Sequence, residues 1–450
     1  MSIFGRMQNT QAHVDTFVVV TAYFKVVCAF FQISGSFLYN LEVEWPDSIT
    51  NLFVGFALFN LDFFALPTTE CMLSDLNHYS KLVICTIVPL VVLALLALPA
   101  AAITVTSREN DTEDKKKTKE KVIAGCSFAI LSFLFVVYPF VSHMVLGTFS
   151  CVPLLPGSNG AWLKTDLREL CPKNSNSPSY AWSIFFTFVY VIGVPALFLS
   201  MLIFFNVPKL ARGKMKMHKL KAVLKEIGIW QSDQFTNWDG TSEPVNFLSS
   251  FQCKEVLEHK FQSRAQFEHG GASDVINEMA NSGLEEGPGL DEETVEVDAE
   301  LPVDELRAAV AKRVDTLCSE QLVVLPPVTW NGETGPEEVF AMENAGFVFT
   351  MYEVDCWWFE IFELIRKLSL SALIIFIGNP DIRLAVAFLI SFLSLLVVFF
   401  TRPFVSPSLD TLMIFSLITQ TLTLSYLQCS CWKMFPRRVL GGKLFSSCGR

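Results

Sequence analysis

The chain has 450 residues, of which 51% are hydrophobic and only 18% charged, whereas soluble domains are roughly 25% charged. Its mean hydropathy is +0.41. Its formal net charge of −11 divides into −21 over residues 226–355 and +10 over the remainder. This composition excludes a collagen-like protein, a fully disordered protein and a nucleic-acid binder.

Long apolar segments predict an all-α polytopic membrane protein with two helical membrane regions, since a spanning helix needs about 20 mostly apolar residues. In the first region, residues 1–206, the predicted spans are 14–39, 48–66, 82–106, 122–147 and 180–206. In the second, residues 358–428, they are 358–378, 383–401 and 409–427. Segment 48–66 is the weakest of these. The favoured count is eight spans, and it becomes seven if that segment lies in the interface.

Basic loops orient the spans, because short loops rich in Lys and Arg stay in the cytoplasm. Loop 107–121 has six bases and residues 207–225 have seven, which places the loop 148–179 outside. Cys151 and Cys171 in that loop are predicted to form a disulfide, which persists only in an oxidising compartment; two free thiols are the alternative. We expect an integral protein of the plasma membrane or the endomembrane system.

Residues 207–357 are predicted to form an acidic, partly disordered cytoplasmic insertion. Within it, residues 284–305 have ten acids and no base, so they repel one another, and residues 303–322 have an amphipathic helical pattern. The start of the insertion is a basic amphipathic helix, typical of an anionic-lipid or calmodulin-like target. The alternative is ordinary cytoplasmic charge. The candidate lipid-binding residues are Lys209, Arg212, Lys214, Lys216, Lys219 and Lys221.

Residues 429–450 form a basic tail with five bases and no acid, which favours the cytoplasm although the count of spans places it outside. Catalytic motifs such as GxxxxGK[ST], GxGxxG, HExxH and GxSxG are missing from the chain, and its six histidines have no metal-ligand spacing. We therefore expect no enzyme activity, no cofactor and no metal.

Polar residues inside predicted spans are costly and often functional. The last span has a polar stripe at positions i, i+3, i+4 and i+7, which either lines a pore or bonds a neighbouring helix: Ser416, Thr419, Gln420 and Thr423. The segment 358–378 begins with a charge cluster, made of Glu360, Glu363, Arg366 and Lys367. Glu363 is three residues from Arg366 and four from Lys367, so it is predicted to pair with both. The favoured interpretation of the cluster is a helix end whose charges pair with one another at the membrane surface. The alternative is a role in gating or coupling.

Several stretches occur in an order that resembles a known family. They include FKVVCAFFQISGSF at 24–37, YVIGVP at 190–195, RPFVSPSLDTL at 402–412 and, most specific, GFVFTMYEVDCWWFEIFELIRKLSLSALIIF at 346–376. The chain is similar to the transmembrane region of the TRP-like family, the fungal, algal and protist relatives of polycystin-type channels. The resemblance covers nearly all of the chain except about 226–340. It implies a multi-pass cation channel, with the lipid bilayer and cations as partners and a homo-oligomeric assembly.

Two other functions remain open at this point. One is a membrane receptor or adhesion anchor that has lost an ectodomain, since the potassium-channel filter TVGYG is missing. The other is a lipid or small-molecule transporter in which the basic helix at 209–225 binds lipid.

Overall fold

The structure is a computed structural model. It describes residues 3–41, 77–106, 113–153, 161–171, 178–235, 238–259, 302–320 and 335–441, with a few further residues between 45 and 56 and between 322 and 331. The chain forms two compact units. Unit 1 comprises residues 1–205 and 340–450, and unit 2 comprises residues 206–339. Residues 340–357, which the sequence assigned to the insertion, therefore belong to unit 1.

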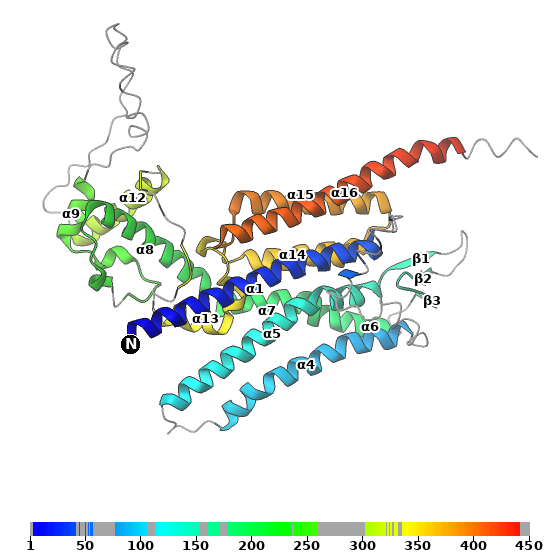
Figure 1. Cartoon of the computed structure of the whole chain (residues 1–450), viewed down its shortest axis with the longest axis horizontal. Coiled ribbons are helices and arrows are strands. Elements are labelled where there is room, and N and C mark those ends of the chain that lie inside the picture. Colours follow the sequence, from blue (N-terminus) through cyan, green and yellow to red (C-terminus); the bar gives the residue numbers. More distant parts are fainter. Residues whose placement is uncertain are drawn as a thin grey trace, which may run out of the picture. The chain divides into compact units, whose positions relative to one another are not determined.

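Unit 1 is mostly helical (Figure 1). Its first half contains α1 (Ile3–Asn40), α4 (His78–Thr106), α5 (Glu113–Gly147), α6 (Pro178–Phe186), the π-helix η3 (Thr187–Ile192) and α7 (Gly193–Phe204). After unit 2 come α13 (Pro336–Phe349), which enters unit 1 at residue 340, the short η6 (Val354–Cys356), α14 (Phe359–Ser371), η7 (Leu373–Phe376), α15 (Pro380–Thr401) and α16 (Pro407–Gly441).

Five described helices are long and apolar enough to cross a membrane: Phe17–Leu38, His78–Val105, Lys115–Gly147, Pro178–Phe204 and Pro380–Thr401. They correspond to five of the predicted spans. The predicted span 48–66 lies almost entirely outside the described residues. The predicted span 409–427 lies within α16, which is not among the five. These five helices make the chain a multi-pass membrane protein by length and composition.

The predicted span 358–378 is not one continuous helix. α14 ends at Ser371, and Ala372 leaves helical geometry with φ −133° and ψ −50°. The break frees backbone carbonyls, which need partners away from water. The Asn40 amide donates to the carbonyls of Leu370 and Ser371 at 3.2 and 3.0 Å.

Arg383 of α15 binds the Ile377 carbonyl, which follows the short helix after the break. Its side chain is only 2% exposed, and its Nε and Nη2 donate to the Ile377 carbonyl at 2.9 and 2.6 Å. Its Nη1 donates to the Asn40 carbonyl at 2.7 Å. The end of α1, the break after α14 and the start of α15 are therefore joined by hydrogen bonds.

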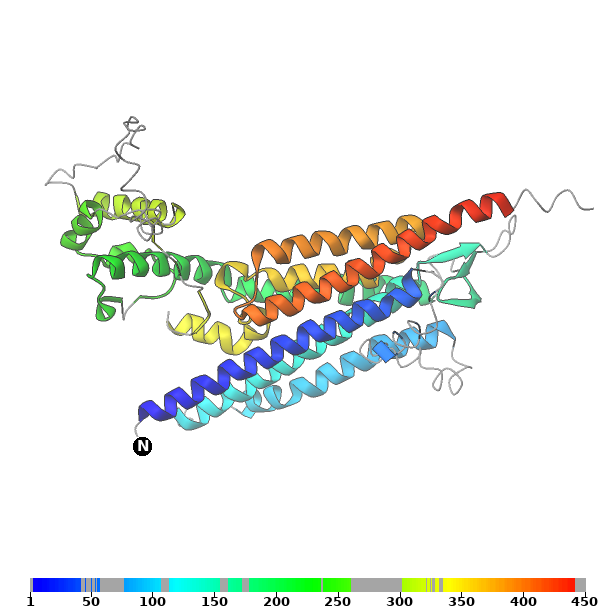
Figure 2. The ribbon, with the colours of Figure 1, turned by 45° about the horizontal axis from the view of Figure 1, so that its top comes forward.

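Ring and hydrogen-bond contacts give the directions of the helices. α1 and α5 run parallel, because the rings of Phe17 and Phe128 lie 5.0 Å apart and, further along, the Gln32 amide donates to the Val136 carbonyl at 2.8 Å. α14 and α16 run in the same direction as α1, whereas α4, α6–α7 and α15 run in the opposite direction (Figures 1 and 2).

Leu41 and Asn77 lie at the same end of unit 1. α4 begins at His78, whose Nε2 lies 3.0 Å from the Thr148 hydroxyl just beyond α5. Since α1 and α5 are parallel, α1 ends there too. The eight-span arrangement puts Leu41 and Asn77 on opposite sides and is therefore wrong, whereas the seven-span alternative fits this geometry.

A small antiparallel sheet, which the sequence analysis did not predict, follows α5 in the loop 148–179 of this mostly helical protein. Its strands are β1 (Cys151–Pro153), β2 (Ala161–Leu163) and β3 (Asp166–Leu170), in the order β1-β2-β3. Cys151 pairs with Leu163 and Trp162 with Leu170. These strands of three to five residues are too short to show an alternating pattern in the sequence.

Unit 2 is a separate helical core. It contains α8 (Val207–Ile227), η4 (Ser232–Phe235), η5 (Pro244–Phe247), α9 (Ser250–Glu258) and α12 (Val303–Ser319), the last of which confirms the helix predicted over 303–322. Leu220 and Leu224 of α8 pack with residues of α9 and α12, which include Val256 and Val310. The apolar face of the basic helix is therefore buried within unit 2. Residues 284–301 of the acidic run lie outside the described residues.

Candidate functional site: a charge network on α14

The buried face of α14 is polar. Glu360 and Lys367 have no exposed surface, and Glu363 and Arg366 are 5% and 4% exposed, whereas Ile365 on the other face is 53% exposed. Positions three and four apart share one face of a helix, so these four charges point the same way. The four side chains therefore turn into the bundle, whereas the sequence analysis expected them to reach towards the membrane surface.

Lys25 of α1 forms an ion pair with Glu360. Its Nζ lies 2.7 Å from Oε2 of Glu360 and donates to the Phe347 carbonyl at the same distance. It also lies 3.7 Å from the centre of the Phe347 ring. The Tyr352 hydroxyl donates to the same Glu360 oxygen at 2.8 Å. Glu360 Oε1 is buried and has no hydrogen-bond partner among the described residues.

Glu363 and Arg366 form a bidentate pair one helical turn apart. Arg366 Nε donates to Oε1 of Glu363 at 3.0 Å and Nη2 to Oε2 at 2.7 Å, which confirms the pair predicted from i,i+3 spacing. Its Nη1 donates to Oε1 of Gln420 at 3.3 Å, and the Gln420 amide donates to the Phe30 carbonyl at 3.5 Å. Arg366 thus connects α14 to α16.

Lys367 has different partners from those the sequence suggested. Its Nζ donates to Oε1 of Gln32 at 3.3 Å and lies 3.3 Å from the centre of the Phe135 ring. The predicted i,i+4 pair with Glu363 is not formed among the described residues. We call these side chains together the charge network: Lys25, Gln32, Tyr352, Glu360, Glu363, Arg366, Lys367 and Gln420.

A small cavity lies beside the charge network. Its volume is about 10 Å³, which is close to the space that one water molecule needs. Its lining combines charged, aromatic and apolar side chains: Lys25, Val26, Ala29, Phe135, Tyr352, Glu363, Phe404 and Met413. Lys25 and Glu363 thus border one water-sized space among α1, α5, α14 and α16.

Comparison with known proteins gives no match. Neither a family model, nor a curated protein, nor a solved structure matches this chain. The resemblance to the TRP-like family therefore stays a prediction.

The four residues of the polar stripe of α16 differ in burial and in hydrogen-bond partners. Gln420 is 3% exposed and belongs to the charge network. The other three are half-buried, and each hydroxyl donates to a carbonyl four residues back: Ser416 to Leu412, Thr419 to Phe415 and Thr423 to Thr419. Only one residue of the stripe therefore bonds other helices.

The candidate lipid-binding residues also differ in burial and in their partners. Lys214 is buried in unit 2, where it forms an ion pair with Glu338 and donates to the Asn331 side chain at 2.7 Å. Lys216 pairs with Glu243, Lys219 pairs with Asp315, and Lys221 lies 5.4 Å from the centre of the Trp230 ring. Lys209 and Arg212 are exposed.

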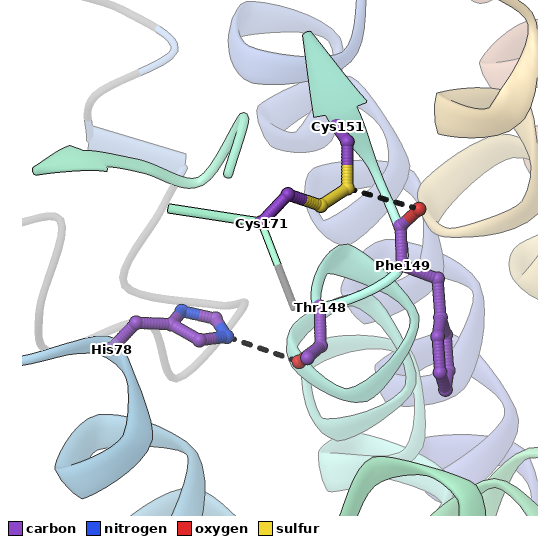
Figure 3. The surroundings of a disulfide bond; sticks show 5 residues. All are labelled: His78, Thr148, Phe149, Cys151 and Cys171. Atoms are coloured by element: carbon purple, nitrogen blue, oxygen red, sulfur yellow. Dashed lines mark hydrogen bonds between the residues drawn. A yellow bond between two sulfur atoms is a disulfide. The ribbon is translucent and has the colours of Figure 1, made fainter. Parts of the chain in front are cut away.

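Cys151 and Cys171 are joined by a disulfide, as predicted, with Cα atoms 5.9 Å apart (Figure 3). The disulfide thus joins the first strand of the sheet to the residue that follows the third.

Two polar contacts lie close to the disulfide and its sheet. In the same view His78 points to Thr148 at the end of α5. On β3, hydrogen bonds from Arg168 hold the pKa of the Asp166 carboxyl below its usual range.

Replacing Cys171 with serine is expected to lower the free energy of unfolding by about 3 kcal/mol, because the bond restricts an unfolded loop with a sequence separation of 20. Chemical unfolding of both proteins in the same mixed micelles measures the difference. The control is Cys126→Ser, a free cysteine, which should change little. Recovery of both Cys151 and Cys171 as alkylated thiols from a non-reduced digest would contradict the pairing.

Proposed function

We propose that the chain is a subunit of a gated cation channel in which the charge network holds α16 in its closed position. The observation that carries the proposal is the hydrogen bond from Arg366 to Gln420. It joins the ion-paired helix α14 to the helix with the polar stripe. The resemblance of the sequence to the TRP-like family supports the same function.

The energetics of buried charge favour a functional role for the network. Ionisable side chains inside membrane helices are costly, face the bundle interior and mark ion pathways or sensors. Here the three bases and two acids of the charge network lie on α1 and α14, and none of them is more than 5% exposed. A movement of α14 therefore displaces charge and acts on α16 through Arg366.

In this proposal the pore lies where copies of the chain meet along α16. Three residues connect η7 to α15 and five connect α15 to α16. Both connections are shorter than two helical turns, which leaves no length for a re-entrant pore helix. The half-buried hydroxyls of Thr419 and Thr423 would then face the conduction path in a homo-oligomer.

The test is cation flux and single-channel recording with the purified protein in liposomes. Gln420→Leu removes its bonds to Arg366 and Phe30. The bond from Arg366, which holds the closed position, is worth about 0.6 kcal/mol, so its loss should shift the ratio of open to closed channels roughly threefold. Thr423→Leu should change unitary conductance instead. Ser369→Ala, an exposed hydroxyl on α14, serves as the control and should change neither. Wild-type protein that gives no cation current above background would sink the proposal.

A second candidate function is ion-coupled transport, and the water-sized cavity beside the ion pairs favours it. Carriers place charged groups around a small enclosed site near the middle of the bilayer. The same liposomes separate the two functions. A carrier would accumulate a labelled solute against an imposed ion gradient without unitary currents, and a channel would show unitary currents.

A further inference from the structure

Lys367 is the basic residue of the charge network that has no acid beside it. Lys25 and Arg366 each lie within 4.0 Å of a carboxylate, but among the described residues no carboxylate lies that close to Lys367. Its side chain is fully buried, and its hydrogen-bond acceptor is the neutral amide of Gln32. Two acids against three bases leave one surplus positive charge in a buried space.

The groups that face Lys367 do not remove this surplus. Glu360, Glu363 and Arg366 on its own helix interact electrostatically with Lys367, and so does Cys28 on α1. Lys25, also on α1, shares the Phe135 ring of α5 with it. In the apolar part of α5 the ionisable side chains are Cys126, Tyr138 and His143, none of which is a carboxylate, and α7 has no ionisable side chain. Both carboxylates are already paired with other bases.

A buried ammonium without an anion is costly, and the loss of its proton removes that cost. The contacts at Lys367 suit both forms, because Oε1 of Gln32 accepts a hydrogen bond from an ammonium and from an amine. Release of the proton breaks one N–H bond, leaves the electron pair on Nζ and passes the proton to water.

We propose that Lys367 is a proton-binding site that exchanges its proton with solvent while the protein stays folded. With the proton bound, the charge network has one surplus positive charge. With the proton released, two acids balance two bases. The surplus charge follows from burial and pairing, so the release of this proton does not depend on conduction.

The test compares wild type, Lys367→Met and Lys367→Arg by chemical unfolding in mixed micelles between pH 6 and 9. In the unfolded chain the lysine keeps its proton throughout this range, so wild type gains stability with rising pH once the folded protein releases the proton. We expect its unfolding constant to fall by up to about tenfold per pH unit relative to both variants. Parallel profiles of wild type and Lys367→Arg would overturn the proposal.

Two further variants keep the test decisive. Cys28→Ser should keep the proton step, by which we mean the gain in stability as pH rises. If the step is lost in this variant, the released proton belongs to the cysteine and the proposal is overturned. If neither Lys367 variant folds, Gln32→Leu takes their place. It removes the acceptor that stabilises the ammonium, so the step should move to lower pH, and an unchanged step would count against Lys367.

Discussion

Replacing Lys25 with methionine is expected to destabilise unit 1 by roughly 3–5 kcal/mol. Glu360 has no exposed surface, so its charge would lose its ion pair where water cannot replace it. Methionine is nearly as long as lysine and apolar, so the loss of packing is small. Chemical unfolding in mixed micelles at neutral pH measures the effect.

The double variant Lys25→Met, Glu360→Gln is the matched control. It removes both charges, so much of the lost stability should return. Tyr352→Phe removes only the hydroxyl that donates to Glu360 and should cost about 1 kcal/mol. If Lys25→Met costs no more than Tyr352→Phe, the ion pair is not formed in the folded protein.

Replacing Gly213 with alanine is expected to destabilise unit 2 by about 1–3 kcal/mol or more, as overpacking does. A Cβ atom there would lie 2.0 Å from the Gly240 carbonyl oxygen and 3.0 Å from its carbon. These are backbone atoms, so α8 or the loop must move. The gain in helix propensity, about 1 kcal/mol, does not offset this clash. Chemical unfolding, followed by the fluorescence of the unit 2 tryptophans, measures the loss.

Gly125→Ala provides the comparison. Gly125 lies within α5, and nothing lies within 4 Å of the Cβ position. There alanine should be neutral or stabilise by up to about 1 kcal/mol. The same small effect at both positions would show that α8 does not pack against the Gly240 loop.

Hydropathy was enough to predict the five apolar helices, because spanning length and apolar content are local properties of a segment. The orientation of each helix about its axis depends on its neighbours and could not be predicted in the same way. Glu363 and Arg366 were predicted to pair because one turn separates them. Lys25 and Glu360 are 335 residues apart and carried no local signal.

The position of α14 in the bundle explains why the Lys25 pair was missed. Glu360 lies in the first turn of α14, which suggests the membrane surface, whereas Lys25 lies well inside its predicted span. The two residues meet because α14 begins inside the bundle. The ion pair of Lys214 in unit 2 also carried no local signal, since its partner Glu338 lies 124 residues away.

The interrupted end of α14 has a mechanical consequence. Asn40 and Arg383 donate to carbonyls that would otherwise face apolar surroundings, so a sliding movement at this junction exposes several unpaired backbone groups at once. The end of α1, α14 and the start of α15 therefore behave as one stiff body. Any displacement of the network charges carries α15 with it.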